Sequence, residues 1–468
     1  MALLEDEGLD AHLIPSDVFA IPTPDEFGSA LPLVDAVVGN PPFVRYQEHR
    51  GAARQRSIAA ALKQGVRLSG LASSWASVVV HSSGFLKPDG RLAMVLPAEL
   101  LTVHYAEPIR RWLRHRFAGV TLVMFERLQF DDALEKVVLL LAHGSGGCDS
   151  FSLVYVEDAS DLASLHFGDS VSVTPASEGK WTDLLLPLAR RRRYREVVAS
   201  HFLNLSQIGS VELGTVTGAN HYFALSEAAR HEYGLTEELL RPICPPGSRH
   251  LRGTTFTKAH WERLKAAGER VWLLCPEPED ETPSLRRYVE RGEREGVNQA
   301  YKCQVRSPWW RPPVVAPPDL FFTYMSHRYP RFVRNTAKTS LLNSMHGVRL
   351  KRDTPRAVGA ALPLLALNSV TMLGAEIHGR AYGGGMLKME PREALSLPVP
   401  SIKALLAAWD RLKAERQALD RQLQDGLWTN VAKRVDEVLL HETIGLPLAD
   451  VAELHDAAAS LRERRLGQ

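Results

Sequence analysis

The sequence predicts an α/β protein in which an incomplete doubly wound (Rossmann-like) sheet precedes an α+β domain and a C-terminal helical segment. Three observations support this order. Apolar runs of strand length alternate with helical stretches over residues 1–150. After a linker at 151–199, short β runs punctuated by glycine occupy residues 200–400. Leucines then recur at three- and four-residue steps between charges over residues 401–468.

Length and composition describe an ordinary globular protein. A chain of 468 residues can form two or three domains with full cores, and 45% hydrophobic and 24% charged residues are typical values. The net charge of +2 gives no basic field over the whole protein, so charge alone does not point to nucleic acid. No run of 18 uninterrupted apolar residues and no basic signal-peptide start is present, so we expect no membrane association and a cytoplasmic location.

The cysteines do not suggest a metal site or a disulfide scaffold. They are few and widely spaced, at Cys148, Cys244, Cys275 and Cys303. A zinc site usually needs closely paired cysteines, and small disulfide scaffolds need many more. We therefore expect four reduced, structural cysteines and no bound metal.

The first elements end in polar residues. Residues 3–13 have a helix-like pattern. Residues 14–19 are expected to form the end of a strand, and this end carries Asp17. The next apolar run, Val34 to Gly39, has strand length and β-branched content, and it stops at Asn40-Pro41-Pro42-Phe43. Two consecutive prolines prevent the strand from continuing, and their fixed φ angles make this segment rigid. We call residues Asn40 to Phe43 the corner.

The chemistry of this corner suits a nucleobase amine. Asn40 offers one carbonyl acceptor and two NH₂ donors, and the carbonyls of Pro41 and Pro42 are aimed by fixed φ angles. Phe43 supplies a flat face for a base, worth about 1–3 kcal/mol of stacking. The alternative interpretation is a turn that merely ends a strand.

The elements after the corner continue the α/β alternation. Residues 44–70 are basic, polar and without strong periodicity, so we expect a loop over the substrate. The remaining pattern predicts, in order, a helix at 72–86, a strand at 91–97, a helix at 98–117, and strands at 120–125 and 137–142.

The corner resembles the Asn-Pro-Pro-Phe/Tyr signature of the γ-ordered DNA methyltransferases that modify adenine N6, found in restriction-modification and phage-defence systems. The resemblance implies that Asn40 and a proline carbonyl draw the amine lone pair out of conjugation. The nitrogen then attacks the methyl group of S-adenosylmethionine. It also implies that Phe43 and Phe130 hold the flipped adenine, because N6 is inaccessible inside a duplex. A plain core role for Phe130 is the alternative.

The same resemblance assigns the cofactor contacts. A strand-end acid before the Asn-Pro-Pro strand contacts the adenine of the cofactor, and Asp17, Val18 and Asn40 match these positions; a loop-capping acid is the alternative for Asp17. The family's Asp/Phe-x-Gly-x-Gly loop is not found before Asp17. We therefore expect a second polypeptide to supply the cofactor-binding half, unless that half has been lost or the start is misplaced.

The second half resembles the target-recognition domain of these enzymes and predicts binding to double-stranded DNA. Residues 190–195 hold five arginines and one tyrosine, and they include Arg191 and Arg193. Trp309, Trp310 and Arg328 lie in a second aromatic and basic stretch. A solvated helix end and an aromatic core with solvated arginines are the respective alternatives.

The sequence therefore favours an adenine-N6 DNA methyltransferase chain, with restriction or defence subunits as further partners. One alternative is a catalytically silent DNA-binding specificity subunit that retains the Asn-Pro-Pro-Phe corner. A second alternative methylates protein glutamine or RNA, although the large second half argues against it. No Pro-Asp with Glu-x-Lys arrangement indicates a nuclease.

Overall fold

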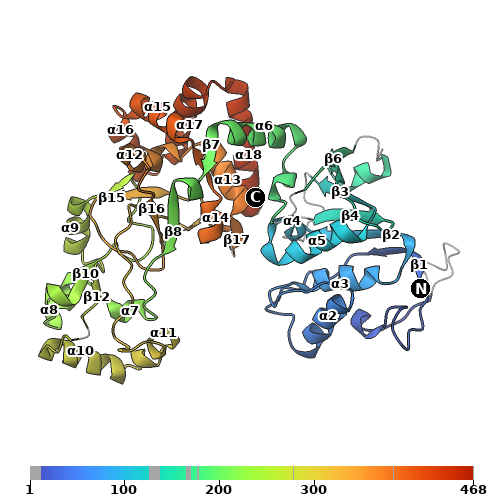
Figure 1. Ribbon diagram of the computed structural model, residues 1–468, viewed down its shortest axis with the longest axis horizontal. Helices are drawn as coiled ribbons and strands as arrows, with labels where there is room; N and C mark the ends of the chain where they lie inside the picture. Colours follow the sequence, from blue (N-terminus) through green and yellow to red (C-terminus); the bar gives the residue numbers. More distant parts are fainter. Residues whose placement is uncertain are drawn as a thin grey trace. The chain divides into compact units, whose positions relative to one another are not determined.

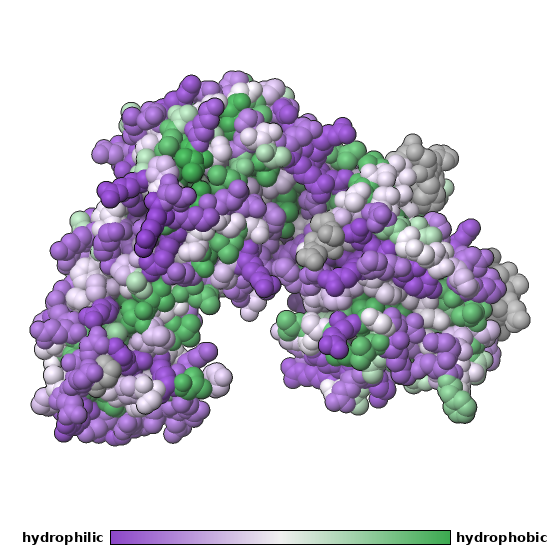
Figure 2. Space-filling view, in the orientation of Figure 1, coloured by the Kyte–Doolittle hydropathy of each residue, from purple (hydrophilic) through white to green (hydrophobic). Residues whose placement is uncertain are grey.

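The computed structural model divides the chain into two compact units, Met1–Leu188 and Ala189–Gln468. The residues that it describes are 12–125, 137–164, 170–175, 179–277, 279–382 and 384–466. Phe130 lies outside these ranges. Figure 1 shows the elements of both units, and Figure 2 shows that each presents a mostly hydrophilic face with scattered apolar patches.

The first unit is built on a six-stranded sheet of order β1-β2-β4-β3-β5-β6. Its strands are β1 (Val34–Gly39), β2 (Leu86–Pro97), β3 (Gly119–Phe125), β4 (Val137–His143), β5 (Phe151–Val156) and β6 (Val171–Val173). The pairs β1–β2 and β3–β5 are parallel, whereas β4 runs antiparallel to both of its neighbours. The α/β class is confirmed, and the sheet is mixed. Residues 151–173, expected in a linker, add two strands to it.

One face of this sheet carries most of the core. Alternate residues of β2, such as Leu92, Met94 and Leu96, are buried with Trp75 and Leu113 of the covering helices. Alternation arises because successive strand side chains point to opposite faces. On the other face, the buried cluster is small and centres on Val123, Val154 and Val156.

The helices of the first unit differ from the expected ones in two places. They are η1 (Val18–Ala20), α2 (Gly51–Lys63), α3 (Ser74–Ser83), α4 (Glu99–Thr102), η2 (His104–Ala106), α5 (Glu107–Arg116), η3 (Ala159–Ser164) and η5 (Thr182–Leu185). The expected loop at 44–70 instead contains α2, and the expected helix at 98–117 is interrupted at Val103, whose backbone is extended.

The expected strand end at 14–19 is also wrong. Ile14 is 43% exposed, and the segment forms the short η1 turn, capped by the Asp17 side chain. A buried strand needs apolar neighbours on a sheet, and this segment packs on α2 and α3 instead.

The second unit combines five-, three- and two-stranded sheets with helices. Its strands are β7 (Phe202–Asn204), β8 (Gly209–Leu213), β9 (Ala224–Leu225), β10 (Leu240–Pro242), β11 (Thr255–Phe256), β12 (Trp272–Leu274), β13 (Leu320–Phe322), β14 (Met325–Ser326), β15 (Phe332–Asn335), β16 (His346–Leu350), β17 (Arg380–Tyr382), β18 (Met386–Lys388) and β19 (Pro398–Pro400). The five-stranded sheet has the order β11-β15-β13-β16-β8. Short β runs in this half were predicted from the glycine-punctuated sequence.

Helices complete the second unit. They are α6 (Leu188–His201), η6 (Leu205–Gln207), α7 (Asn220–Phe223), α8 (Glu227–Glu232), η7 (Glu237–Leu239), α9 (Lys258–Ala266), α10 (Pro283–Arg294), η8 (Val297–Gln299), α11 (Tyr301–Gln304), α12 (Arg356–Leu365), α13 (Ser369–His378), α14 (Pro391–Leu395), α15 (Ile402–Leu412), α16 (Arg416–Gln424), α17 (Trp428–Asp436), η9 (Glu437–Thr443) and α18 (Leu448–Leu466). The helical segment after residue 400 packs on its own chain, because α15 contacts α12 and α18 contacts α13.

The apolar helices α12 and α13 form the core of this packing. Across the described ranges, no single helix combines the length and the apolar content that crossing a membrane requires. Only α12 and α13 together meet both criteria, and they meet at a bend of 82°.

Candidate functional site

The Asn40-Pro41-Pro42-Phe43 corner lies at the carboxyl end of β1, where the strand leaves the sheet. Asn40 and Pro42 are exposed, Pro41 is buried, and Phe43 is half-buried against the core of the unit. Within the described ranges, no group hydrogen-bonds to the Asn40 side chain or to the Pro41 carbonyl. The corner therefore carries two adjacent acceptors that no described residue occupies, one on the exposed Asn40 and one on the buried Pro41.

Ser74, at the start of α3, fixes the corner through hydrogen bonds to the backbone of Pro42 and Val44. Its hydroxyl donates to the Pro42 carbonyl and accepts from the Val44 amide at 3.0 Å. Its own backbone amide donates to the Val44 carbonyl at 3.0 Å. Ser74 is only 4% exposed. The Pro42 carbonyl is thus occupied, which leaves the Pro41 carbonyl as the available proline acceptor.

A buried network supports the first turn of α3. Trp75 Nε1 donates to the Tyr105 hydroxyl at 2.9 Å, and that hydroxyl donates to the Glu99 carboxylate. Burial, followed by the nearby Glu99 charge, raises the pKa of Tyr105 well above its usual range. The tyrosine therefore remains a neutral donor that links α3 to the turn after β2.

The structure does not bring Asp17 and Val18 to the corner. His81, near the end of α3, has Nε2 2.9 Å from the Val18 carbonyl. Ser74 and His81 are separated by seven residues, which is about 10 Å of helix. The amino end of β1 lies near the end of α3, because the Val34 amide donates to the carbonyl of Phe85, just after that helix, at 2.8 Å. Asp17 therefore lies toward the opposite end of β1 from Asn40.

Asp17 also has partners of its own. Its Oδ2 accepts from Arg56 Nη2 at 2.8 Å, and its Oδ1 accepts from the Phe19 amide at 3.1 Å. The Arg56 hydrogen bond is the largest cause that lowers the pKa of Asp17. For Asp17, this arrangement is the capping role that was the alternative to a cofactor contact.

The residues expected to bind DNA differ in exposure. Arg191 is 3% exposed, which leaves almost no guanidinium surface for a phosphate. Arg193 forms ion pairs with Asp450 and, at 3.6 Å, with Glu196. The pair with Asp450 connects α6 to α18, so the structure gives Arg191 a role in packing and Arg193 a role in ion pairing.

The aromatic residues of the second stretch also have structural roles. The Trp309 ring lies 5.7 Å from the Tyr222 ring, and its Nε1 donates to Glu293 at 3.2 Å. Trp310 is half-buried, whereas Arg328 is exposed. The structure places Arg328 beside α18 rather than with the two tryptophans, so these residues do not form one patch.

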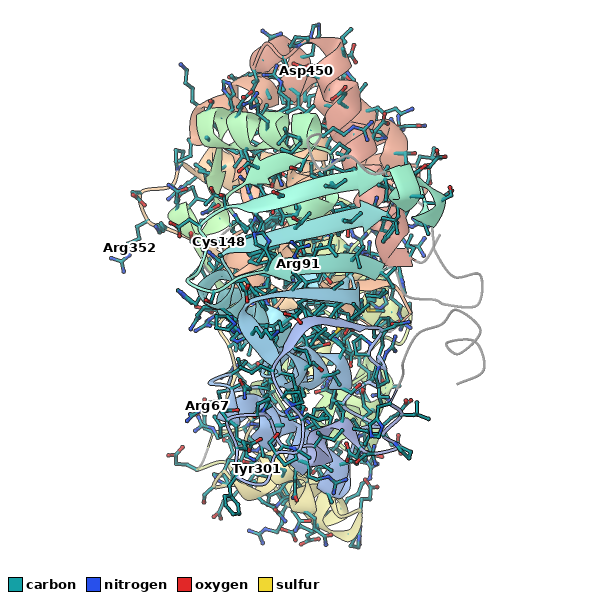
Figure 3. The ribbon with its side chains drawn as sticks, turned by 90° about the vertical axis from the view of Figure 1, so that its right-hand side faces the viewer. Arg67, Arg91, Cys148, Tyr301, Arg352 and Asp450 are labelled. Carbon is teal, nitrogen blue, oxygen red and sulfur yellow. The ribbon has the colours of Figure 1, made fainter. Side chains whose placement is uncertain are left out.

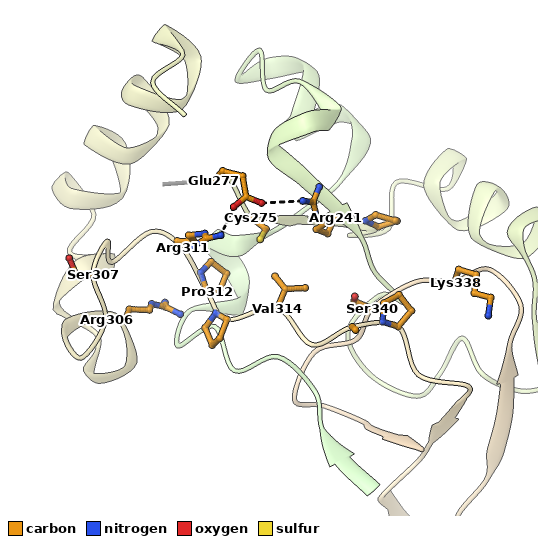
Figure 4. A pocket seen from close by; sticks show the side chains of 14 residues that line it. Arg241, Cys275, Glu277, Arg306, Ser307, Arg311, Pro312, Val314, Lys338 and Ser340 are labelled. Atoms are coloured by element: carbon orange, nitrogen blue, oxygen red, sulfur yellow. Dashed lines mark hydrogen bonds and ion pairs between the residues drawn. The ribbon is translucent and has the colours of Figure 1, made fainter. Parts of the chain in front are cut away.

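A cavity of about 740 Å³ in the second unit carries several cations (Figure 4). Arg241 and Arg311 both pair with Glu277, and Arg306 donates to the Thr217 carbonyl. These contacts engage all three guanidinium groups, and Glu277 balances one of the positive charges that line the cavity. We also find no group of three His, Cys, Asp or Glu side chains suited to a metal ion in the described part of the chain.

Two protein families match the sequence. Residues 178–440 match the family described as Type II methyltransferase M.Eco57I, C-terminal domain. Residues 33–129, which include the corner, match the family described as Eco57I restriction-modification methylase. The match over residues 33–129 lies within the first unit, and the match over residues 178–440 begins near the end of the first unit and covers most of the second.

Two curated relatives share 24% identity with the chain. Type II methyltransferase M.AccI of Acinetobacter calcoaceticus aligns over 370 residues, 77% of this chain and 67% of its own length. Type II methyltransferase M.XamI of Xanthomonas campestris pv. amaranthicola aligns over 384 residues, 80% and 69% respectively. The chain thus spans about two thirds of each relative.

Solved structures of restriction enzymes are more distant. The type IIG restriction endonuclease BpuSI has a TM-score of 0.43 and 13% identity, over 97% of this chain and 55% of that one. The Type IIL enzyme MmeI, solved in complex with DNA, has a TM-score of 0.45 and 11% identity, over 92% and 57%. The chain spans little more than half of either structure.

Proposed function

The chain belongs to the family of Type II methyltransferase M.Eco57I C-terminal domains, and on this basis we propose that it is a site-specific DNA adenine-N6 methyltransferase chain. The proposed cofactor is S-adenosylmethionine, and the proposed partner is double-stranded DNA. The proposed setting is a restriction-modification system. This proposal is supported by both family matches and by the two Type II methyltransferases among the relatives.

The observation that carries the proposal is the pair of free acceptors at the corner. The exocyclic amine of adenine has two N–H groups, so one can donate to Asn40 Oδ1 and the other to the Pro41 carbonyl. Accepting both hydrogens directs the nitrogen lone pair out of the ring plane. S-adenosylmethionine, when bound, supplies the electrophilic methyl group. The nitrogen would gain the methyl group as the bond between the sulfonium sulfur and the methyl carbon breaks, which leaves S-adenosylhomocysteine, and the nitrogen would lose one proton to solvent.

Phe43 is the proposed surface for the extruded base. Its ring is half-buried against the core, so its position is fixed while part of it remains exposed. A flipped base can stack on such a ring at little cost in side-chain entropy. Phe130 remains a proposed second contact, although it lies outside the described residues.

The cofactor half is proposed to come from a second polypeptide. β1 is an edge strand, and on its outer side it pairs with no strand among the described residues. Val38 of this strand is 80% exposed. An unpaired edge with an exposed apolar side chain favours pairing with a further strand.

The need for that polypeptide can be tested by titration with S-adenosylmethionine. We expect calorimetry to detect binding when the purified chain is mixed with the protein encoded beside it, and weak or no binding to the chain alone. Tight binding to the chain alone would contradict a split site. Binding in neither case would favour the silent specificity subunit.

The methyltransferase function itself is tested by mapping modified bases in the host genome. We expect N6-methyladenine at one recurring sequence in cells that carry the gene, and its loss when the gene is deleted. A genome in which no adenine site depends on the gene would contradict the proposed function.

Ser74 is expected to be a positioning residue for this reaction. Replacing it with alanine frees the Pro42 carbonyl and loosens the corner, and a displacement of about 1 Å can cost about 100-fold in rate. We expect Ser74→Ala to lower kcat about 10- to 100-fold, with KM for DNA nearly unchanged. Single-turnover methylation with radiolabelled cofactor measures the effect, and Ser74→Thr should restore much of the rate.

Ser83→Ala provides the matched control. Ser83 is also buried in α3, at 2% exposed, but its hydroxyl donates to Val80 of the same helix at 2.7 Å. Both alanine variants should lose similar thermal stability. Equal loss of kcat in the two variants would show that Ser74 acts only on the fold.

A further inference from the structure

Five basic side chains gather at one edge of the five-stranded sheet. In this sheet β13 runs antiparallel to both β15 and β16, so the ends of β15 and β16 meet at one edge. β15 ends at Asn335 and β16 ends at Leu350, and each leads into a basic turn. The five cations are Arg334, Lys338, Lys351, Arg352 and Arg356.

These five residues line a hollow of about 510 Å³, which we call the cation hollow. Its lining includes one carboxylate, Asp319, whose Oδ2 already accepts from the Leu350 amide at 2.9 Å. Among the described residues, none of the five cations forms a side-chain hydrogen bond or an ion pair. The hollow therefore concentrates positive charge that the chain itself does not neutralise.

The turn that carries Lys338 is held in place by a buried side chain. Asn335, 3% exposed, donates through Nδ2 to the carbonyls of Pro318 at 3.0 Å and Thr339 at 2.9 Å. Lys338 adopts a φ of 57°, a left-handed conformation that costs energy for a residue with a side chain. The fold thus holds this lysine at the rim instead of leaving it on a free loop.

Three of the cations surround the start of α12. Arg352 projects away from the ribbon into solvent (Figure 3), and Lys351 and Arg356 are also exposed. α12 begins at Arg356 and has no side chain that caps its first turn. The positive end of the helix dipole adds to the field of these side chains, which favours an anion.

The lining also indicates which part of a ligand is bound. It contains no aromatic residue, and Leu350 is its one large apolar side chain. A free nucleotide needs a surface for its base as well as charge for its phosphates. A nucleic-acid backbone needs only the charge.

We propose that the cation hollow binds backbone phosphates of double-stranded DNA. This inference rests on the proposed function, because it names the surface through which the second unit holds that substrate. The contacts are independent of sequence: they fix the position of the duplex and carry no base readout.

The test is the salt dependence of binding to a random 30-base-pair duplex, measured by fluorescence anisotropy with the full chain. Each lost phosphate contact lowers the slope of log Kd against log salt by about 0.9. We expect Lys351→Ala/Arg352→Ala/Arg356→Ala to lower the slope by about 2.7. Between 50 and 200 mM salt, the Kd of the wild type should then rise about 40-fold more than that of the variant.

The matched control removes the same charge from α10. Arg286, Arg287 and Arg294 are exposed on that helix, and Figure 1 shows it away from α12 within the same unit. We expect the triple alanine variant of α10 to retain the wild-type slope. Equal slopes for both triple variants, or no duplex binding by the wild type, would overturn the inference. Single-stranded RNA that competes more tightly than the duplex would also overturn it.

The salt-dependence test of the cation hollow can fail or succeed independently of the methylation test of the proposed function. A lower slope, together with no methylation of adenine even when the genomic neighbour is present, would support the cation hollow and contradict the proposed chemistry. An unchanged slope in an active enzyme would contradict the cation hollow alone.

Discussion

Asn40→Ala is expected to abolish nearly all methyl transfer, with a loss of about 10²- to 10³-fold, while DNA binding stays near the wild-type value. The reason is that one of the two acceptors of the amine disappears, and the nitrogen lone pair is no longer directed out of the ring plane. Folding should be unaffected, because Asn40 is exposed and hydrogen-bonds to none of the described residues. Single-turnover methylation and anisotropy, measured on the same sample, separate the two effects.

Two further variants sharpen this result. Asn40→Asp retains an acceptor oxygen and should keep part of the rate, so it separates the acceptor from the amide donors. Asn430→Ala removes another exposed asparagine, in α17, and should change neither rate nor affinity. Loss of DNA binding in Asn40→Ala, with the fold intact, would contradict the catalytic role.

Arg465→Ala is expected to destabilise the second unit by about 3–5 kcal/mol. Arg465 Nε and Nη2 each donate to the Glu376 carboxylate at 2.8 Å, and the two side chains are 5% and 6% exposed. The arginine also donates to the carbonyls of Gly385 and His327, so it joins α18 to the β17–β18 hairpin. Removing it leaves a buried, unpaired carboxylate.

Urea unfolding of the full chain, followed by tryptophan fluorescence, measures this loss. The double variant Glu376→Leu/Arg465→Met should lose less stability than the sum of its single variants, because neither charge is then buried alone. An exposed pair, Asp410 and Lys413, provides the control, and its removal should cost about 0–1 kcal/mol. Additive losses in the buried pair would contradict the coupling.

The sequence predicted the elements whose signal is local. The apolar runs at 91–97, 120–125 and 137–142 lie in strands β2, β3 and β4, because a short, nearly continuous apolar run is typical of a buried strand. It did not predict that β4 runs antiparallel between β2 and β3. Strand order depends on contacts between distant segments, which a single sequence does not contain.

Only the part of the candidate site that is continuous in sequence was predicted, because contacts between distant segments leave little local signal. The Asn-Pro-Pro-Phe corner is continuous in sequence, so its rigidity is visible there. Ser74 lies 30 residues after Val44, and the signal it leaves is a polar pair, Ser73 and Ser74, before an apolar helix. The cation hollow joins the ends of two strands, whereas the continuous arginine run at 190–195 proved to contain a buried residue, Arg191.

The most direct measurement is nucleoside mass spectrometry of duplex DNA that contains the mapped site, after incubation with the chain, its genomic neighbour and isotopically labelled methyl donor. All label should appear as N6-methyladenine, and a duplex whose target adenine is replaced by purine, which lacks the amino group, should take up none. Label on cytosine, or undiminished label on the purine duplex, would contradict a corner that holds the adenine amine.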